Sequence, residues 1–150
     1  MTDIVFYHLT ETTLDEALPV LVERSVARQW NVTIQAGDDA SRDRLDSRLW
    51  EYATDSFLPH GKDGDDQVDK HPIFVTTTGL NQNASNIRFV VENAELPEGL
   101  NAYERVAIMF DGKDDYSVNQ ARGNWKNLKE AGHALTYWNQ SPEGKWERQV

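Results

Sequence analysis

Short apolar segments alternate with helical patterns along the first third of this chain. Residues Ile4–Leu9 form a β-branched and aromatic run that is typical of a buried strand. A capping box follows, in which the Thr13 hydroxyl can accept from the Glu16 amide while the Glu16 carboxylate reaches back, so a helix should begin there. Residues 31–36 alternate as a second strand, and a second helix is expected over about 40–52. This order of strand, helix, strand and helix favours an α/β fold with a parallel sheet.

The rest of the chain continues this order within one expected domain, residues 1–150. Pro19 lies beyond the first turn of the first helix and should kink or locally unpair it before the helix ends near Trp30. A third helix is expected over about 116–131, with Gly132 at its C′ position. Further strands are expected at 73–75, 87–91, 105–110 and 134–138, with an acidic mobile loop over 61–70 and a polar tail from about 141.

The composition narrows the classes of function. The chain has 150 residues and 39% hydrophobic content, which suits one domain with one proper core. Its net charge of −10 would repel a phosphate backbone and argues against direct nucleic-acid binding. It contains no cysteine, which excludes disulfides and thiolate metal sites. We see no charged leader and no apolar run near the roughly 18 residues of a membrane span, so we expect a cytoplasmic protein without a membrane partner.

An enzyme on a doubly wound sheet would place its site where parallel strands end. Asp111, with Asp114 and Asp115 behind it, follows the strongest strand, so a small α/β enzyme or a nucleotide- or metal-binding domain that uses Asp111 stays open. The commoner role of such acids is to cap the next helix. No G-x-G-x-x-G follows the first strand, and no G-x-x-x-x-G-K-[ST] occurs, so both phosphate-binding signatures are missing. The four histidines lack metal-ligand spacing, and we expect His60 to form a hydrogen bond within a loop. The residues predict no cofactor, no metal site and no catalytic residue.

The helix over 116–131 carries a basic edge beside its apolar stripe. Arg122, Lys126 and Lys129 lie at i, i+4 and i+7, which places them along one side. A solvated face usually explains such a row, but this row is nearly free of acids in a strongly negative chain. It is a plausible dock for an acidic peptide whose carboxylate Arg122 or Lys126 would clamp, and Lys113 and His133 would extend it. The stripe should face the sheet, with Trp125 in the core: Val118, Ala121, Trp125 and Leu128.

An apolar, aromatic segment follows the second helix. It runs from Leu49-Trp50 to Ser56-Phe57-Leu58-Pro59-His60-Gly61, where a loop that only had to stay dissolved would be polar. Trp50 would either close the helix against the core or contact a partner. Phe57 would either plug the loop over the core or contact a partner, and its Pro-containing loop favours the partner, because interface anchors are commonly exposed aromatics.

These segments occur in an order that resembles a known family. The set is similar to the chi subunit of bacterial DNA polymerase III, and the resemblance spans the chain from the first strand to Trp138. It implies a three-layer α/β/α, Rossmann-like fold with a mostly parallel sheet. It also implies a non-catalytic accessory of the clamp-loader assembly in DNA replication. The segments that carry it are Phe6-Tyr7-His8-Leu9, Thr12-Thr13-Leu14-Asp15, Leu45 with Leu49-Trp50, Asp55-Ser56-Phe57-Leu58-Pro59-His60-Gly61, and Ala121-Arg122 through Trp125-Lys126 to Ala131-Gly132-His133.

The resemblance implies a first partner, the psi subunit, which tethers chi to the clamp-loader ATPase. Trp50, Phe57 and Pro59 fall on the family's psi-facing surface. In some members of the family the same surface engages a helicase-like protein.

The second implied partner is the acidic carboxyl-terminal tail of single-stranded-DNA-binding protein (SSB), which ends in Pro-Phe. Arg122 falls on the family position that meets this tail, and Lys126 matches a basic position one turn later. Val118 stands where the family has another basic residue, which removes one charge. We expect Arg122 to pair with the terminal carboxylate while the phenyl ring enters an apolar pocket near the helix and the adjacent strand. The acids that precede Pro-Phe would meet Lys126 and Lys129.

Overall fold

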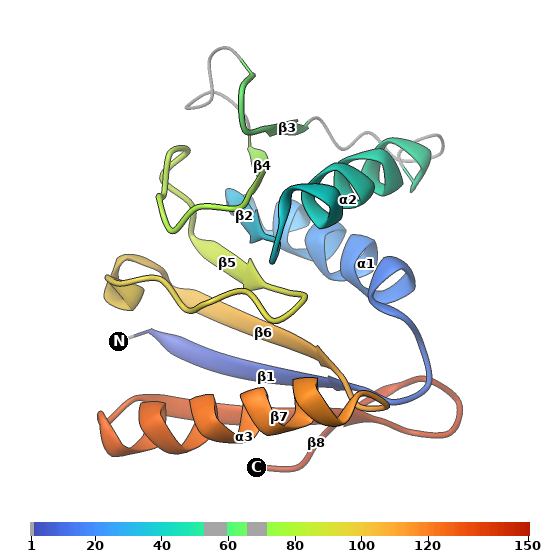
Figure 1. Cartoon of the computed structure of the whole chain (residues 1–150), viewed down its shortest axis with the longest axis vertical. Helices are drawn as coiled ribbons and strands as arrows, with labels where there is room; N and C mark the ends of the chain where they lie inside the picture. The colour runs from blue at the N-terminus through green and yellow to red at the C-terminus, as the bar shows by residue number, and fades with distance from the viewer. Residues whose placement is uncertain (1, 53–59, 66–71) are drawn as a thin grey trace.

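A mostly parallel sheet runs through the middle of the molecule, with helices on both faces (Figure 1). The computed structural model describes residues 2–52, 60–65 and 72–150. Within them, eight strands lie in the order β3-β4-β2-β5-β6-β1-β7-β8, and the β7–β8 pair is antiparallel. The elements are β1 (Asp3–Leu9), α1 (Leu14–Ala27), β2 (Val32–Gln35), α2 (Asp39–Tyr52), β3 (His60–Lys62), β4 (Ile73–Thr76), β5 (Ile87–Val90), η2 (Leu100–Ala102), β6 (Arg105–Asp111), α3 (Asp115–Glu130), β7 (Ala134–Gln140) and β8 (Trp146–Arg148).

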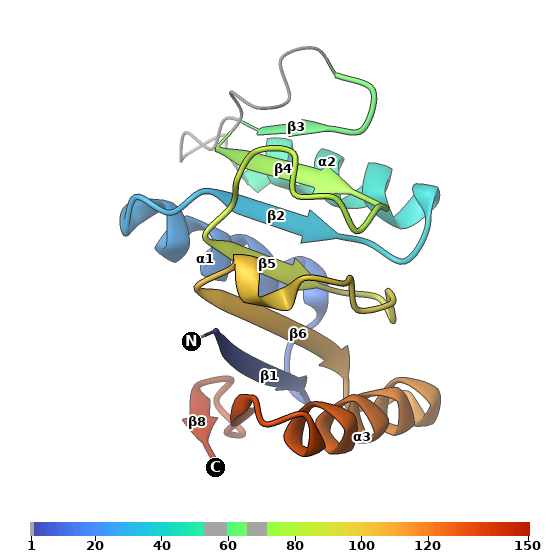
Figure 2. The same ribbon diagram turned by 90° about the vertical axis from the view of Figure 1, so that its left-hand side faces the viewer.

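The sheet separates the core into two apolar layers, one beneath α1 and α2 and the other beneath α3, and two perpendicular views show this arrangement (Figures 1 and 2). Under α1 and α2, the packed residues include Leu18, Ile34 and Leu45, whereas Phe6 and Leu128 pack on the α3 face. Successive side chains of a strand point to opposite faces, so each central strand contributes to both layers. The predicted three-layer, Rossmann-like α/β fold is confirmed. None of the described helices is long and apolar enough to cross a membrane.

The first helix begins at the predicted capping box. Thr13 Oγ1 accepts from the Glu16 N–H at 3.3 Å, and Glu16 Oε1 accepts from the Thr13 N–H at 3.1 Å. The helix ends at Ala27, three residues before the predicted end near Trp30. The reason is local, because Gln29 adopts a φ of 65°, which lies outside the helical region.

Because Pro19 has no N–H, a backbone carbonyl of α1 can accept a hydrogen bond from α2. This proline lacks the N–H that would donate to the Asp15 carbonyl within α1, and the helix continues through it. Arg48 Nε of α2 donates to that carbonyl at 2.8 Å. The predicted local unpairing therefore leaves an acceptor that a neighbouring helix uses.

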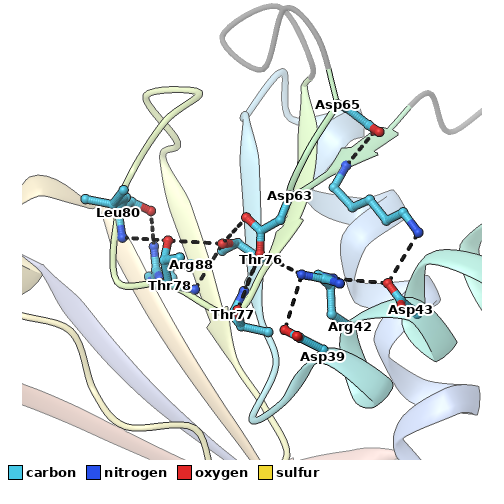
Figure 3. Close-up of polar contacts among 11 residues, drawn as sticks. Asp39, Arg42, Asp43, Asp63, Asp65, Thr76, Thr77, Thr78, Leu80 and Arg88 are labelled. Atoms are coloured by element: carbon cyan, nitrogen blue, oxygen red, sulfur yellow. Dashed lines mark hydrogen bonds and ion pairs between the residues drawn. The ribbon is translucent and has the colours of Figure 1, made fainter.

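An edge strand occupies part of the expected acidic loop. Residues His60–Lys62 pair in parallel with β4 as strand β3. The next residue, Asp63, accepts from the Thr76 hydroxyl at 2.7 Å and from the Thr77 N–H at 2.9 Å, and pairs with Arg42 at 3.3 Å (Figure 3). The loop prediction is wrong for residues 61 and 62. It rested on the local acidic composition, whereas strand β3 forms by pairing with β4, which lies farther along the chain. Residues 66–71 lie outside the described part.

His60 is buried in this strand rather than placed in a loop. Its Nε2–H donates to the Asp46 carbonyl at 3.2 Å, and the same nitrogen lies 3.2 Å from the Asp46 carboxylate. The expected hydrogen-bonding role is confirmed, and the expected loop setting is wrong.

The last ten residues fold as half of a hairpin. β7 extends to Gln140, Gly144 turns the chain with a φ of 83°, and β8 returns antiparallel to β7. Trp146 of β8 packs edge-on against Tyr7 with ring centroids 5.0 Å apart. The segment expected to be a polar tail therefore forms a strand over 146–148, in which polar residues pair with β7 and one aromatic ring packs on the sheet.

Candidate functional site

A first hollow lies where β1 and β6 end, at the place where nucleotides bind in many α/β folds. This cavity has a volume of about 350 Å³, and Glu11, Glu92, Asp111 and Asp114 are among its lining residues. Asp111 Oδ1 accepts from the Lys113 N–H at 2.9 Å, which closes the turn before α3. Asp114 is the N-cap residue of α3 and accepts from the Ser117 hydroxyl at 2.7 Å. The acids thus act in the turn and the helix start, and they make the cavity negative.

The loop between β1 and α1 has its amide groups occupied by a side chain of β7. Gln140 Oε1 accepts from the N–H groups of Thr10, Glu11 and Thr12 at 3.0, 2.9 and 3.1 Å. Gln140 Nε2 donates in turn to the Thr12 hydroxyl at 2.7 Å. Loop amides in this position hold phosphate in nucleotide-binding folds. Here an internal amide oxygen takes that place, and carboxylates line the adjoining cavity, so the cavity does not fit the phosphates of a nucleotide.

The described residues also contain no cluster of three or more His, Asp or Glu side chains that could hold a metal ion. Among the described residues, the alternative of an enzyme that uses Asp111 therefore has neither unoccupied β1–α1 loop amides nor a metal-binding cluster to support it.

A second hollow lies between α3 and the part of the sheet formed by β1 and β7. Its volume is about 650 Å³, and aromatic rings form most of its floor. Phe6 meets Trp125 at 5.2 Å between centroids, Trp125 meets Tyr137 at 5.9 Å, and His8 stacks on Phe110 at 4.7 Å. We call it the α3 pocket; it is lined by Phe6, His8, Phe110, Val118, Ala121, Arg122, Trp125, Tyr137, Asn139, Gln149 and Val150.

The apolar stripe of α3 faces the sheet as predicted. Ala121 and Leu128 are buried, while Val118 and Trp125 are partly buried and pack against the same core. Trp125 is thus a core residue by its contact with Phe6, and it also presents a surface to the α3 pocket. Val118, which stands where the family has a basic residue, contributes an apolar side chain to the pocket wall instead.

Arg122 brings a charge to the rim of this apolar pocket. Its side chain is exposed, and so are those of Lys126 and Lys129 farther along the helix. Among the described residues, no ion pair joins any of these three cations to a carboxylate. The predicted basic edge is therefore present and available, and Arg122 is its member that borders the pocket. Lys113 lines the acidic cavity instead.

His8 lies beside Arg122 on the pocket floor. Its Nδ1 forms a hydrogen bond with the Tyr137 hydroxyl. Burial, and then the positive charge of Arg122, lower the pKa of His8 below its ordinary value of 6.5. Gly112 makes room for this ring, because a Cβ at Gly112 would lie 2.2 Å from His8 Nε2. The lowered pKa favours the neutral imidazole, and Arg122 supplies a positive charge at the pocket.

Sequence reasoning found only part of the far side of this pocket. Tyr137 lies in the strand that was expected at 134–138, and Asn139 lies just beyond that range in β7. Gln149 and Val150 follow β8, in the part expected to be a polar tail. The pairing of the last residues with β7 had no local signature.

The residues expected to face psi are not placed by the structure. Phe57 and Pro59 lie outside the described residues. Trp50 belongs to α2, next to the buried Leu49, but its side chain is also outside the described part. The roles expected for Trp50 and Phe57 stay predictions.

Comparison with known proteins identifies relatives over nearly the whole chain. The family model described as "DNA polymerase III chi subunit, HolC" matches residues 1–136. The chain is 28% identical over 141 residues to DNA polymerase III subunit chi of Haemophilus influenzae, covering 92% of this chain and 94% of that protein. It is 27% identical over 141 residues to the Pseudomonas aeruginosa chi subunit, with 90% and 94% covered. A probable chi subunit of Rickettsia prowazekii is 22% identical over 154 residues, with 99% and 92% covered.

Proposed function

Because this chain belongs to the DNA polymerase III chi subunit family, we propose that it is a non-catalytic adaptor that links the psi subunit to the acidic tail of SSB. As an adaptor of the clamp-loader assembly it would act in the bacterial cytoplasm and without a cofactor. It would also have no direct contact with nucleic acid, which its net charge of −10 disfavours.

One observation carries the SSB half of this proposal: Arg122, which has no ion-pair partner among the described residues, lies at the rim of an aromatic-lined pocket. A guanidinium binds a carboxylate through two parallel hydrogen bonds, and such charge-assisted bonds are the stronger class. The rings of Phe6, Trp125 and Tyr137 offer edge and face contacts to one more aromatic side chain. A peptide that ends in Phe supplies both groups, the ring and the carboxylate, within one residue.

The remainder of α3 suits the acids that precede that residue. Lys126 and Lys129 are exposed on the same edge, and at about 1.5 Å per residue they lie roughly 6 and 10 Å along the helix from Arg122. Acidic side chains spaced along an extended peptide can therefore meet them in succession. Val118 leaves the preceding turn uncharged, so the charged contact would begin at Arg122.

Titration of a labelled acidic peptide that ends in Pro-Phe tests the assignment. Arg122→Ala should weaken binding by about tenfold to a hundredfold, because charge-assisted hydrogen bonds contribute about 1.5–3 kcal/mol. Arg24→Ala is the matched control, since Arg24 is exposed on α1 at the opposite face of the sheet. A peptide whose carboxylate is blocked as an amide should lose the same affinity for the wild type. Equal binding by Arg122→Ala and the wild type at low salt would show that the assignment is wrong.

The psi half of the proposal comes from the family resemblance. Trp50, Phe57 and Pro59 correspond to its psi-facing surface, where a helicase-like protein is a further candidate partner. Phe57→Ala should weaken the association with psi while leaving the melting temperature nearly unchanged. A large fall in melting temperature would instead assign Phe57 to the core.

A further inference from the structure

A third cavity lies at the amino-terminal edge of the parallel strands, where β1 and β6 begin side by side (Figure 2). Its volume is about 580 Å³, and we call it the edge cavity. Arg28 and Trp30 at the end of α1 line it together with Arg105 at the start of β6. The edge cavity shares no lining residue with the α3 pocket, so it is a separate surface.

The end of α1 places an aromatic ring against a guanidinium group. Gln29 turns the chain with its φ of 65°, and the Trp30 N–H donates back to the Ser25 carbonyl at 3.1 Å. The guanidinium carbon of Arg28 lies 3.9 Å from the centroid of the Trp30 ring, and that of Arg105 lies 5.5 Å from it. A guanidinium over a ring is held in place by attraction to the π system, while its N–H groups point outward in its own plane.

The donors of these arginines lack carboxylate partners. Among the described residues, no ion pair joins Arg28, Arg105 or Arg24, one turn earlier on α1, to an acid. The Arg105 Nε atom is shielded from solvent and has no hydrogen-bond partner in the same part of the chain. A shielded donor without an acceptor is costly, so a ligand that brings an oxygen to it is favoured.

The charges of the three arginines act at one place. Burial raises the pKa of the Tyr7 hydroxyl, and the positive charges of Arg105, Arg24 and Arg28 act against that rise. A chain with a net charge of −10 thus has a local positive region beside the start of its sheet. That region favours an anionic ligand.

The acids around the edge cavity indicate which anion suits it. Asp3 and Glu104 line the cavity, and Glu104 Oε2 accepts from Asn86 Nδ2 at 3.1 Å rather than pairing with an arginine. A phosphate monoester carries about 1.5–2 negative charges at pH 7, so these acids and the net charge of the chain repel it strongly. A carboxylate carries one charge, and its two oxygens match the planar fork of a guanidinium. The cavity therefore fits a carboxylate better than a phosphate.

We propose that the edge cavity binds a carboxylate side chain from an acidic segment of a partner protein, with Arg28 and Arg105 as donors and Trp30 as the ring that positions them. Arg24 lies roughly 6 Å along α1 from Arg28 and would meet a second carboxylate of the same segment. The inference goes beyond the proposed function and does not depend on it, because the α3 pocket supplies none of these residues.

The test uses the full chain labelled with ¹⁵N and, as the probe, a tetraglutamate peptide that is acetylated and amidated. This glutamate peptide has neither the Phe nor the terminal carboxylate that the α3 pocket is proposed to bind. At constant ionic strength it should shift the NMR signals of the Trp30 indole N–H and the Arg105 Nε–H in a saturable way. Arg28→Gln should weaken the binding by about threefold to tenfold, because it removes a charge-assisted contact at a site open to solvent.

Two further variants show where the glutamate peptide binds. The double variant Arg28→Gln, Arg105→Gln should lose the saturable shift of the Trp30 signal. Lys145→Gln is the matched control, since it removes one positive charge from an exposed residue in the turn that follows β7, at the opposite edge of the sheet. Its affinity should stay within about twofold of the wild type, because a distant exposed charge is screened. An unchanged melting temperature of Arg28→Gln would show that its loss arises at the edge cavity.

Three results would overturn the inference. The first is a wild type whose two signals do not shift with the glutamate peptide, and the second is wild-type affinity in both the single and the double variant. The third is tighter binding at the same signals by inorganic phosphate or by a thymidine oligonucleotide, which would replace the carboxylate by a phosphate ligand. The acidic Pro-Phe peptide is measured separately, so loss of its binding would refute the proposed function and leave the edge cavity untouched.

Discussion

Arg88 offers the sharpest test of how this fold is held together away from its apolar layers. It lies on β5, on the sheet face opposite α1 and α2, and its side chain is 0% exposed. Gln35 Oε1 accepts from Nε at 3.1 Å and from Nη2 at 2.9 Å. Nη1 donates to the Tyr103 hydroxyl at 2.9 Å. It also donates to the Leu80 carbonyl at 2.9 Å, and Nη2 donates to the Thr78 carbonyl (Figure 3).

Among the described residues, every hydrogen-bond partner of this buried cation is a neutral group. Burial lowers the pKa of Arg88. Arg88→Met keeps much of the side-chain volume but removes all five hydrogen bonds. Water can reach the Thr78 and Leu80 carbonyls, because they belong to a surface connection, whereas the Gln35 and Tyr103 oxygens would stay buried. Two unsatisfied buried acceptors cost about 1–3 kcal/mol each, and relief of the desolvation of the cation offsets part of that. We expect a net loss of about 2–4 kcal/mol in the free energy of unfolding.

Urea denaturation of three variants measures this loss and its cause. Arg88→Lys should cost at least as much as Arg88→Met, because an ammonium keeps the buried charge without the planar fork that reaches these acceptors. Tyr103→Phe removes one partner and should cost about 0.5–1.5 kcal/mol. Affinity for the acidic peptide should not change in any of them, since Arg88 does not line the α3 pocket. A stability of Arg88→Met within about 0.5 kcal/mol of the wild type would refute the reasoning. In some proteins the replacement of buried charged groups by apolar ones leaves the stability unchanged, so this outcome is a genuine alternative.

Two further predictions concern the surroundings of the pocket. The pKa of His8 is lowered in the folded state by burial and by Arg122, so its contribution to stability is present above the ordinary pKa of 6.5 and is lost as the pH falls through the folded value. Arg122→Ala should raise the pKa of His8 in an NMR titration, and an unchanged pKa would show that the two side chains do not interact. Gln140→Ala leaves three loop amides without their acceptor and should cost about 1–3 kcal/mol, with faster hydrogen exchange at Thr10 and Thr12. Unchanged exchange at those amides would contradict this account of the loop.

Much of the fold could be predicted because the signals are local. The Thr13 capping box lies within four residues, and Gly132 at the end of α3 has the positive φ of 88° that favours glycine. The stripe of α3 reads directly as a buried face, since a helix repeats every 3.6 residues. In each of these cases the residues that determine the structure are neighbours in the chain.

The errors fall on edge strands, where the determining partner is distant. β3 is three residues long and exists through pairing with β4, while β8 depends on β7 and on the contact of Trp146 with Tyr7. Neither strand is long enough to show alternation, and both lie in polar or acidic surroundings. The same limit explains the missed part of the pocket, because Gln149 and Val150 reach it only through that hairpin.

The position of the pocket follows from how β7 uses its two faces. Tyr137 and Asn139 point to the α3 side, and Gln140, at the end of the strand, turns to the β1–α1 loop and occupies its amides. The cavity at the strand ends is therefore closed to anions by the same strand that builds the wall of the α3 pocket. Because one strand does both, freeing the loop amides would also loosen the wall beside Asn139. The loop amides at the strand ends are thus occupied by Gln140, which agrees with the peptide-binding role proposed for the helix face rather than with a phosphate site.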